Sequence, residues 1–91
     1  MKKHLLIFGK VQNVGFRYWL YAKAIKKNIH GWVNNKNTGE VEALLIGNEE
    51  DVNEIIKQCE KGPHSSNVTH IESHDYKKDY SKKSFDILSS N

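Results

Sequence analysis

The chain has very little of the residues that cross-link or bend small folds. It contains one cysteine, one proline and one arginine among 91 residues. A single thiol cannot form an internal disulfide, so the fold does not depend on an oxidising compartment. Cys59 falls at the spacing of a helical core position, which predicts a buried structural thiol rather than a reactive one.

Long apolar segments are absent as well. The apolar run after the basic N-terminus stops at Gly9, which makes it too short for the apolar region of a secretory signal. No segment approaches the ~20 apolar residues of a membrane-spanning helix. We therefore expect a cytoplasmic protein without membrane association. The length suits one domain over residues 1–91, because domains typically run to about 100–150 residues.

The motifs of several enzyme classes are also missing. The five histidines show no HExxH or other metal-ligand spacing. There is no phosphate-binding loop of the form G-x-x-x-x-G-K-S/T, and no serine stands in the strand–turn–helix context of a nucleophile elbow. The net charge of +3 would suit an anionic ligand or a nucleic acid, but net charge alone speaks to solubility and steering. We expect no metal and no cofactor.

Apolar periodicity predicts two amphipathic helices. The first begins near residue 16, and its apolar face is made of Phe16, Trp19, Leu20 and Ala24. The second follows Asn48, a residue suited to capping a helix N-terminus, and has acidic residues in its first turn. Its apolar face is made of Val52, Ile55, Ile56 and Cys59.

Strands are expected around these helices. They cover residues 3–9, 29–35, 40–46 and 67–75, and a short strand at 85–87 precedes a frayed end at 89–91. Turn residues at 36–39 join the second and third strands in a hairpin. The order β-α-β-β-α-β predicts an α+β, ferredoxin-like split β-α-β two-layer sandwich, with an antiparallel sheet and both helices on one face. That fold hosts many functions and cannot name one.

The loop before the first helix has the features of an anion site. It contains Gly9 and Gly15 and ends beside Arg17. Unpaired N–H groups at a helix N-terminus and in a curled glycine-containing loop attract negative charge. Arg17 is the sole arginine, and a guanidinium can fork onto two phosphate oxygens as a lysine cannot. The residues alone leave two interpretations open, an anion-binding arginine or a surface arginine beside a structural turn.

Asn35 is the second candidate, at the end of a predicted strand before the turn at 36–39. An asparagine there commonly forms the turn through its own hydrogen bonds. A neutral amide also both donates and accepts, so it can hold and aim a water molecule without acting as a base. The local sequence leaves both roles open.

Two longer motifs make the chain resemble the acylphosphatase family. Residues 9–17 read Gly-Lys-Val-Gln-Asn-Val-Gly-Phe-Arg and resemble the signature G-x-V-Q-G-V-x-F-R. Residues 31–41, followed by Gly47, resemble the second signature, a glycine and an aromatic residue followed by V-x-N-x-x-x-G-x-V and a later glycine. Gly62, Pro63 and Val68 resemble the segment before the family's fourth strand. The resemblance covers essentially the whole chain.

The resemblance implies a metal-independent hydrolase that splits the carboxyl–phosphate bond of acyl phosphates into a carboxylate and inorganic phosphate. By position, Arg17 would bind the phosphoryl group and Asn35 would orient the attacking water. Amides of the loop would cradle the phosphate oxygens, and the residues concerned are Val11, Gln12, Asn13, Val14, Gly15 and Phe16. The implied partner is a small-molecule acyl phosphate, with no nucleic acid and no cofactor, bound to a monomeric protein.

One position departs from the family's pattern, because Asn13 stands where the family usually has glycine. If the loop needs a positive φ there, asparagine is the best residue other than glycine but still carries a cost. The departure bears on loop rigidity and rate, and not on the identity of the reaction.

Two alternatives without catalysis share the fold. RNA-recognition domains place stacking aromatic residues on their third strand, whereas residues 41–46 here, Val-Glu-Ala-Leu-Leu-Ile, contain none. A ligand-binding ferredoxin-like domain could use the same anion site without turnover. Asn35 discriminates between binding and hydrolysis, because binding alone needs no oriented water.

Overall fold

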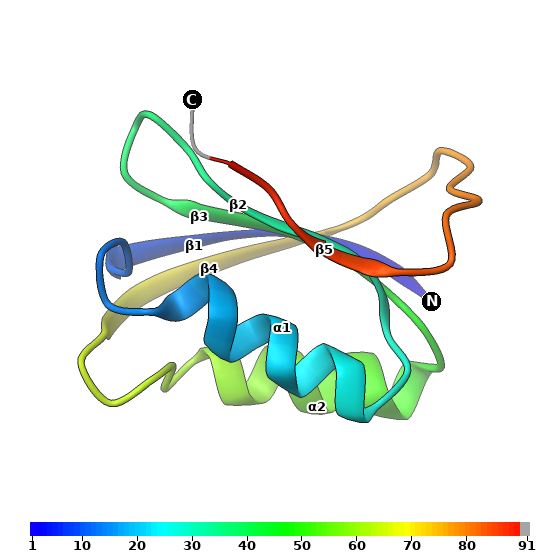
Figure 1. The fold of residues 1–91 in the computed structure, drawn as a ribbon, viewed down its shortest axis with the longest axis horizontal. Coiled ribbons are helices and arrows are strands. Elements are labelled where there is room, and N and C mark those ends of the chain that lie inside the picture. Colours follow the sequence, from blue (N-terminus) through cyan, green and yellow to red (C-terminus); the bar gives the residue numbers. More distant parts are fainter. Residues whose placement is uncertain (90–91) are drawn as a thin grey trace.

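The sheet and the helices form two layers (Figure 1). The computed structural model describes residues 1–89, so the frayed end expected at 89–91 lies partly outside the described residues. In chain order the elements are β1 (Lys2–Lys10), α1 (Phe16–Lys26), β2 (His30–Asn35), β3 (Val41–Ile46), α2 (Glu49–Cys59), β4 (Asn67–Asp75) and β5 (Phe85–Ile87). The strands expected from the sequence are all present, with bounds within one residue of the prediction.

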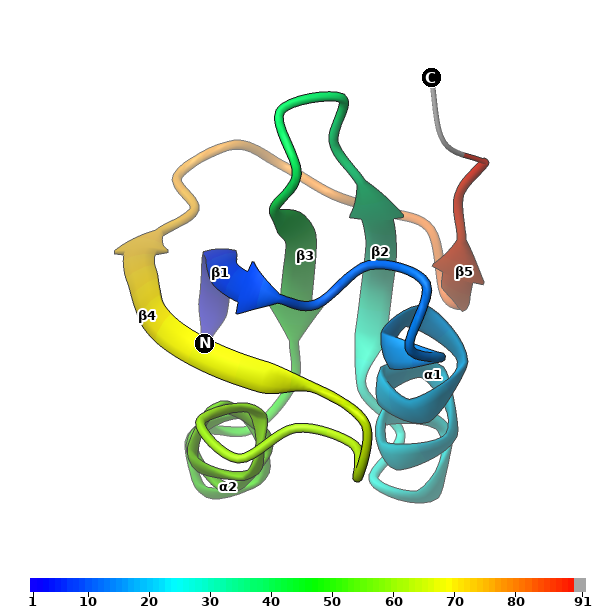
Figure 2. The same ribbon diagram turned by 90° about the vertical axis from the view of Figure 1, so that its left-hand side faces the viewer.

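The strands lie in the order β4-β1-β3-β2-β5 (Figure 2). β1 is antiparallel to both β3 and β4, and β3 is antiparallel to β2. Both helices cover the same face of this sheet (Figure 1). Neither of these helices, within residues 1–89, is long and apolar enough to span a membrane. The expected ferredoxin-like, two-layer α+β architecture is confirmed.

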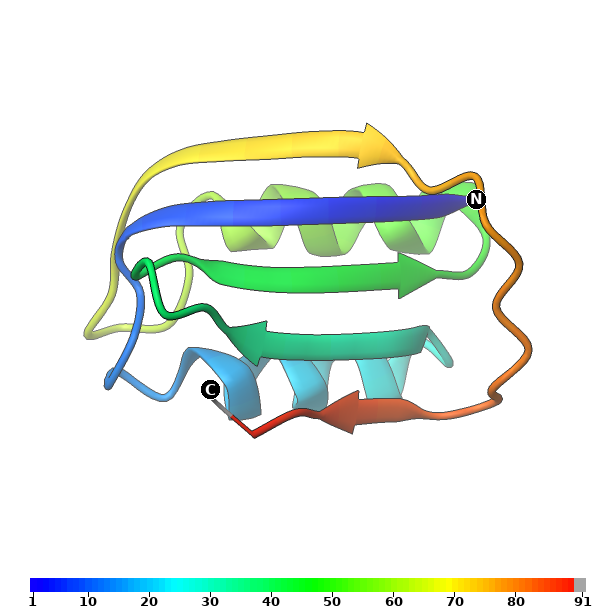
Figure 3. The same ribbon diagram turned by 90° about the horizontal axis from the view of Figure 1, so that it is seen from above.

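The fifth strand corrects the expectation of a purely antiparallel sheet. β5 pairs with β2 in parallel, with Gly31 opposite Phe85. β4 ends where β1 and β2 begin, and residues 76–84 then carry the chain along that end of the sheet to the opposite edge (Figure 3). A strand that starts at this end must run in the same direction as β2. The sheet is therefore mixed, and only its other four strands are antiparallel.

The core lies between the two layers and uses the apolar faces expected from the sequence. The buried residues of the helices are Phe16, Leu20, Ala24, Val52, Ile55 and Cys59. Alternate residues of β1 and β3 fill the core from the sheet side, namely Leu5, Ile7, Val41, Ala43 and Leu45. Trp19 and Ile56 are partly buried and pack at its margin. Burial of each large apolar side chain contributes about 1.5–3 kcal/mol.

The Cys59 thiol provides a test of this packing. It is completely buried, and burial, with a smaller contribution from Glu60, raises its pKa from 9.0 to about 12. Between these pH values the unfolded chain has lost the thiol proton while the folded chain keeps it, so the free energy of unfolding falls as the pH rises. We expect the native thiol to resist a reagent such as DTNB near pH 8 and to react fully in denaturant.

Urea titrations at about pH 8 and about pH 10 measure this loss of stability. Cys59→Ala is the control for other groups that titrate in the same interval, and its free energy of unfolding should fall by less. Rapid modification of the native chain, or equal falls in the two proteins, would contradict the burial of the thiol.

Candidate active site

Three segments that are distant in the sequence meet at one end of the sheet (Figure 3). They are the loop between β1 and α1, the β2–β3 hairpin and the residues that follow β5. A pocket of about 300 Å³ lies where they meet. It is lined by Val11, Asn13, Gly15, Phe16, Arg17, Tyr18, Asn35, Ile87, Leu88 and Ser89.

The loop that leaves β1 is bent by residues with positive φ. Gly9 has a φ of 119°, and a Cβ there would lie 2.2 Å from the Asn67 carbonyl oxygen, so only glycine fits where β1 bulges against β4. Asn13 and Gly15 follow with φ values of 61° and 78°. Val11 is buried at the start of the curl and anchors it to the core. The chain therefore curls beside the pocket instead of crossing directly to α1.

The two helices begin in opposite electrostatic settings. α2 has a capping residue, Asn48, whose Oδ1 accepts the Asp51 N–H at 2.9 Å, and acidic residues fill its first turn. α1 begins after Gly15, which offers no side-chain cap, and its first turn contains Arg17 and no acidic residue. The first N–H groups of α1 thus lack a side-chain acceptor, and the helix dipole adds positive partial charge. This end of α1 is suited to an anion.

The Arg17 guanidinium is held by the segment that follows β5. Its Nη1 donates to the Leu88 carbonyl oxygen at 2.8 Å. Leu88 is itself fixed, because its N–H donates to the Val33 carbonyl oxygen at 2.9 Å. The contact with Leu88 leaves further guanidinium N–H donors for a ligand. A planar fork that is already oriented matches two oxygens of a phosphoryl group.

Asn35 brings a buried acceptor to the pocket. It ends β2, lines the pocket and exposes only 8% of its surface. Its Oδ1 is buried and has no hydrogen-bond partner among residues 1–89. An unsatisfied buried acceptor costs about 1–3 kcal/mol. Asn34 and Gln58 also carry such an oxygen, but neither lines this pocket. Asn35 can therefore accept a hydrogen bond from a water or ligand in the pocket.

The pocket wall includes most of the residues singled out from the sequence, namely Arg17, Asn35, Val11, Asn13, Gly15 and Phe16. Gln12 and Val14 belong to the same loop but not to the wall. The Gln12 side chain bonds to the hairpin, and Val14 packs against the core.

Four lining residues were missed by the sequence analysis: Tyr18, Ile87, Leu88 and Ser89. Tyr18 could have been inferred, because it follows Arg17 in the first helical turn. The other three reach the pocket only because β5 pairs in parallel with β2. No local signal in the sequence indicates that pairing.

Among residues 1–89, the pocket wall contains one cationic side chain, Arg17, and no side chain that would act as a general base. Within the described chain, no carboxylate or imidazole lines the pocket. In the neighbouring hairpin, the Thr38 hydroxyl donates to Glu40 at 2.6 Å and is the main cause of a lowered Glu40 pKa, so this carboxylate is ionised at neutral pH. Nowhere in residues 1–89 do three His, Cys, Asp or Glu side chains gather as metal ligands. The pocket therefore offers hydrogen-bond donors, a guanidinium and a neutral amide.

The strand order, the uncapped start of α1 and the arginine in its first turn define a small α+β domain with a pocket suited to an anion. A family model described as Acylphosphatase matches residues 3–87. The curated acylphosphatase of Nitrobacter winogradskyi is 46% identical over 70 residues, which is 77% of this chain and 71% of that protein. The chain therefore belongs to the acylphosphatase family, as the resemblance of its two motifs implied.

Solved structures agree with this assignment. The crystal structure of acylphosphatase from Bacillus subtilis matches with a TM-score of 0.91 and 31% identity, covering 96% of this chain and 97% of that one. The structure of an acylphosphatase from Coxiella burnetii matches with a TM-score of 0.87 and 28% identity, covering 96% of this chain and 90% of that one. The likeness extends over the β1–α1 loop and the β2–β3 hairpin because it spans nearly the whole chain.

Asn13 adopts the left-handed conformation that its place in the first motif suggested, with a φ of 61°. An alanine at this position would have to hold the same left-handed conformation, at a cost of about 1–2 kcal/mol. We expect Asn13→Ala to lower the free energy of unfolding by about 1 kcal/mol and Asn13→Gly to leave it nearly unchanged. Urea unfolding of the three proteins measures both effects, and an alanine variant as stable as the glycine variant would show that the loop does not require this conformation.

Proposed function

We propose that this acylphosphatase-family protein hydrolyses the carboxyl–phosphate bond of acyl phosphates by direct attack of a water molecule. Arg17 and the loop amides hold the phosphoryl group, and Asn35 orients the water. The observation that carries the proposal is a single pocket that combines the start of α1, the Arg17 guanidinium and the Asn35 amide. The products are a carboxylate and inorganic phosphate.

Binding of the phosphoryl group uses the positive end of the site. Non-bridging oxygens accept hydrogen bonds from first-turn N–H groups of α1 and from the loop amides of residues 11–16. The Arg17 guanidinium donates two further hydrogen bonds to the phosphoryl oxygens. Its bond to the Leu88 carbonyl oxygen fixes its orientation before the substrate binds. Charge that develops on the phosphoryl oxygens in the transition state meets donors that need no reorganisation.

The attacking water is positioned by a group that does not take its proton. Asn35 Oδ1 accepts a hydrogen bond from the water, which turns an oxygen lone pair toward phosphorus. The water oxygen bonds to phosphorus while the bond between phosphorus and the acyl oxygen breaks. The acyl group leaves as a carboxylate, and a phosphate oxygen of the substrate takes the water proton. An acyl phosphate is a mixed anhydride with a good leaving group, so this scheme requires neither a metal nor a covalent enzyme intermediate.

The alternatives without catalysis account for less of the structure. An anion-binding or RNA-binding module would use the start of α1 and Arg17, but it would not need a buried amide acceptor beside them. β3 carries the sequence Val-Glu-Ala-Leu-Leu-Ile, which lacks the aromatic residues on which RNA-recognition domains stack bases. We therefore favour hydrolysis of a small-molecule acyl phosphate over nucleic-acid binding.

We also propose that the chain works as a cytoplasmic monomer without a cofactor. The residues assigned to the reaction all come from one chain, so the proposed mechanism needs no residue from a second copy. Sedimentation or gel filtration at the concentration of the activity assay measures the oligomeric state directly.

Substitution of Arg17 and Asn35 tests the assigned roles. We expect Arg17→Ala and Asn35→Ala to fold and to lose activity by at least ~10²–10³-fold, because each removes one main source of transition-state stabilisation. Hydrolysis of benzoyl phosphate or acetyl phosphate measures the loss, with a phosphate monoester as the negative control. Arg17→Lys is the matched variant that keeps the charge without the fork, and it should also be impaired.

Inhibition by inorganic phosphate separates the two roles. Arg17→Ala should weaken this inhibition, whereas Asn35→Ala should retain it, because only the first removes a phosphate contact. Activity close to that of the unmodified protein in either variant would remove that residue from the mechanism.

A chelator tests the metal-free scheme. We expect turnover of benzoyl phosphate to be unchanged after dialysis against excess EDTA, since the residues assigned to the reaction act through hydrogen bonds and a guanidinium. Addition of Mg²⁺ to the dialysed protein is the control. Loss of activity that Mg²⁺ restores would overturn the scheme.

A further inference from the structure

The side chain of Gln12 joins the two halves of the candidate site. Its Nε2 donates to the Lys36 carbonyl oxygen at 2.7 Å and to the Glu40 carbonyl oxygen at 3.0 Å. The primary amide thus uses both of its N–H donors on the β2–β3 hairpin, although Gln12 lies in the β1–α1 loop. These bonds span 24 and 28 residues of sequence in a partly buried setting.

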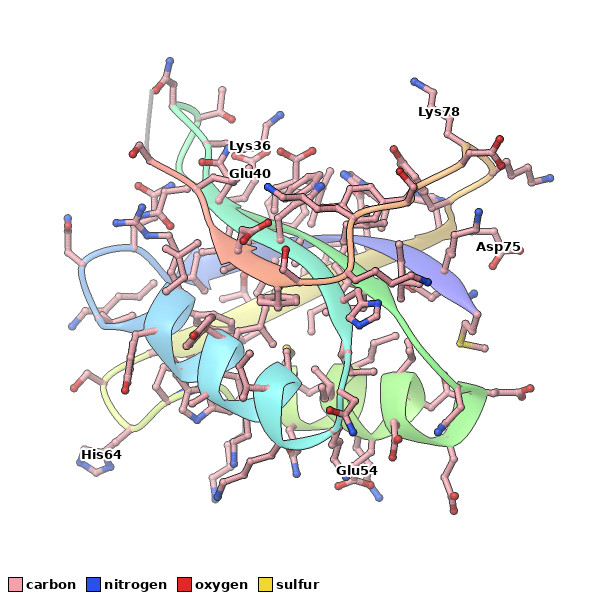
Figure 4. All side chains as sticks on the ribbon, turned by 45° about the vertical axis from the view of Figure 1, so that its right-hand side comes forward. Lys36, Glu40, Glu54, His64, Asp75 and Lys78 are labelled. Carbon is pink, nitrogen blue, oxygen red and sulfur yellow. The ribbon has the colours of Figure 1, made fainter. Side chains whose placement is uncertain are left out.

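The two carbonyl groups that Gln12 binds belong to the residues that close the hairpin. The Lys36 N–H donates to the Glu40 carbonyl oxygen at 2.9 Å, and the Gly39 N–H donates to the Lys36 carbonyl oxygen at 3.1 Å. Figure 4 shows Lys36 and Glu40 close together where the two strands join. Gln12 therefore bonds to both sides of the hairpin turn, directly beyond the ends of β2 and β3.

Asn35 lies directly beside this contact. It precedes Lys36 in the chain, and its partner across the ladder, Val41, follows Glu40. The Asn35 Oδ1 has no hydrogen-bond partner among residues 1–89, so the direction of the amide depends on the backbone that carries it. Gln12 bonds to the residue after Asn35 and to the residue before Val41, so it fixes the position of the Asn35 backbone relative to the β1–α1 loop.

We propose that Gln12 is a positioning residue for hydrolysis, which sets the hairpin against the phosphate-binding loop and so places the Asn35 amide relative to the bound phosphoryl group. The proposal rests on the proposed role of Asn35 as the residue that orients the water. It differs from the role first assigned to Gln12, in which only its main-chain amide faces the phosphate.

The contact uses two N–H donors at the end of a side chain of this length. Asparagine is one methylene shorter, glutamate has no N–H to donate to two carbonyl oxygens, and methionine has the length but no donor. Gln12→Met is therefore the informative change, because it keeps the volume of the side chain and removes only the two hydrogen bonds.

The experiment measures Gln12→Met alone and in the Asn35→Ala background. We expect Gln12→Met to lower kcat by roughly 10- to 100-fold, since two hydrogen bonds are lost and a small displacement of a positioned group is enough for such an effect. The inhibition constant for inorganic phosphate should change by less than about twofold, because the phosphate contacts remain. In the Asn35→Ala background the same substitution should have almost no further effect, which is the signature of two residues acting as one unit.

Gln58→Met is the matched control, because it makes the same exchange at the only other glutamine, on α2 and outside the pocket. It should leave kcat unchanged. Circular dichroism and urea unfolding check that each variant is folded. If Gln12→Met fails to fold, Gln12→Ala replaces it, since a smaller side chain at this partly buried position leaves room for water.

The possible results separate this proposal from the proposed function. An unchanged kcat, a parallel weakening of phosphate inhibition, or a full additional loss in the Asn35→Ala background would overturn the role of Gln12 while Asn35 keeps its own. Full activity of Asn35→Ala alone would instead refute the proposed mechanism, and the role of Gln12 would fall with it.

Discussion

The direction of β1 and β2 is the constraint on which the site depends. Both strands run the same way, because each is antiparallel to the β3 strand between them. Their ends therefore meet at one end of the sheet, where the loop into α1 lies beside the β2–β3 hairpin (Figure 3). This arrangement brings Arg17 and Asn35 into one pocket. A reversal of either strand would place them at opposite ends of the molecule.

The contrast between the two helices shows where this protein departs from local stability rules. α2 follows those rules, with the Asn48 cap and acidic residues at its positive end. α1 breaks them, because Gly15 offers no cap and Arg17 adds a cation where the dipole already disfavours one. Local rules fail most often at functional sites, and here the failure creates the positive surface that a phosphoryl group can occupy.

Local signals in the sequence predicted the strands, the apolar faces of both helices and the Asn48 cap, since each depends on residues within one turn or one strand. The parallel pairing of β5 could not be predicted this way, because it depends on how residues 76–84 cross the end of the sheet. The hydrogen bond from Arg17 to the Leu88 carbonyl oxygen could therefore not be predicted either. The motif assigned a role only to the main-chain amide of Gln12. The bonds of its side chain to the β2–β3 hairpin are evident only in the folded structure.

The nature of the reaction explains why so small a domain is sufficient. Acyl phosphates have a good leaving group, so catalysis reduces to charge stabilisation and the positioning of one water. In the proposed mechanism, main-chain amides of the curled loop and the Arg17 guanidinium supply the charge stabilisation, and the guanidinium is held by its bond to the Leu88 carbonyl oxygen. In the same mechanism, the Asn35 amide at the end of β2 positions the water. Precision in this site therefore comes from the sheet and its connections, which the core already stabilises, and it requires no additional layer of structure around the pocket.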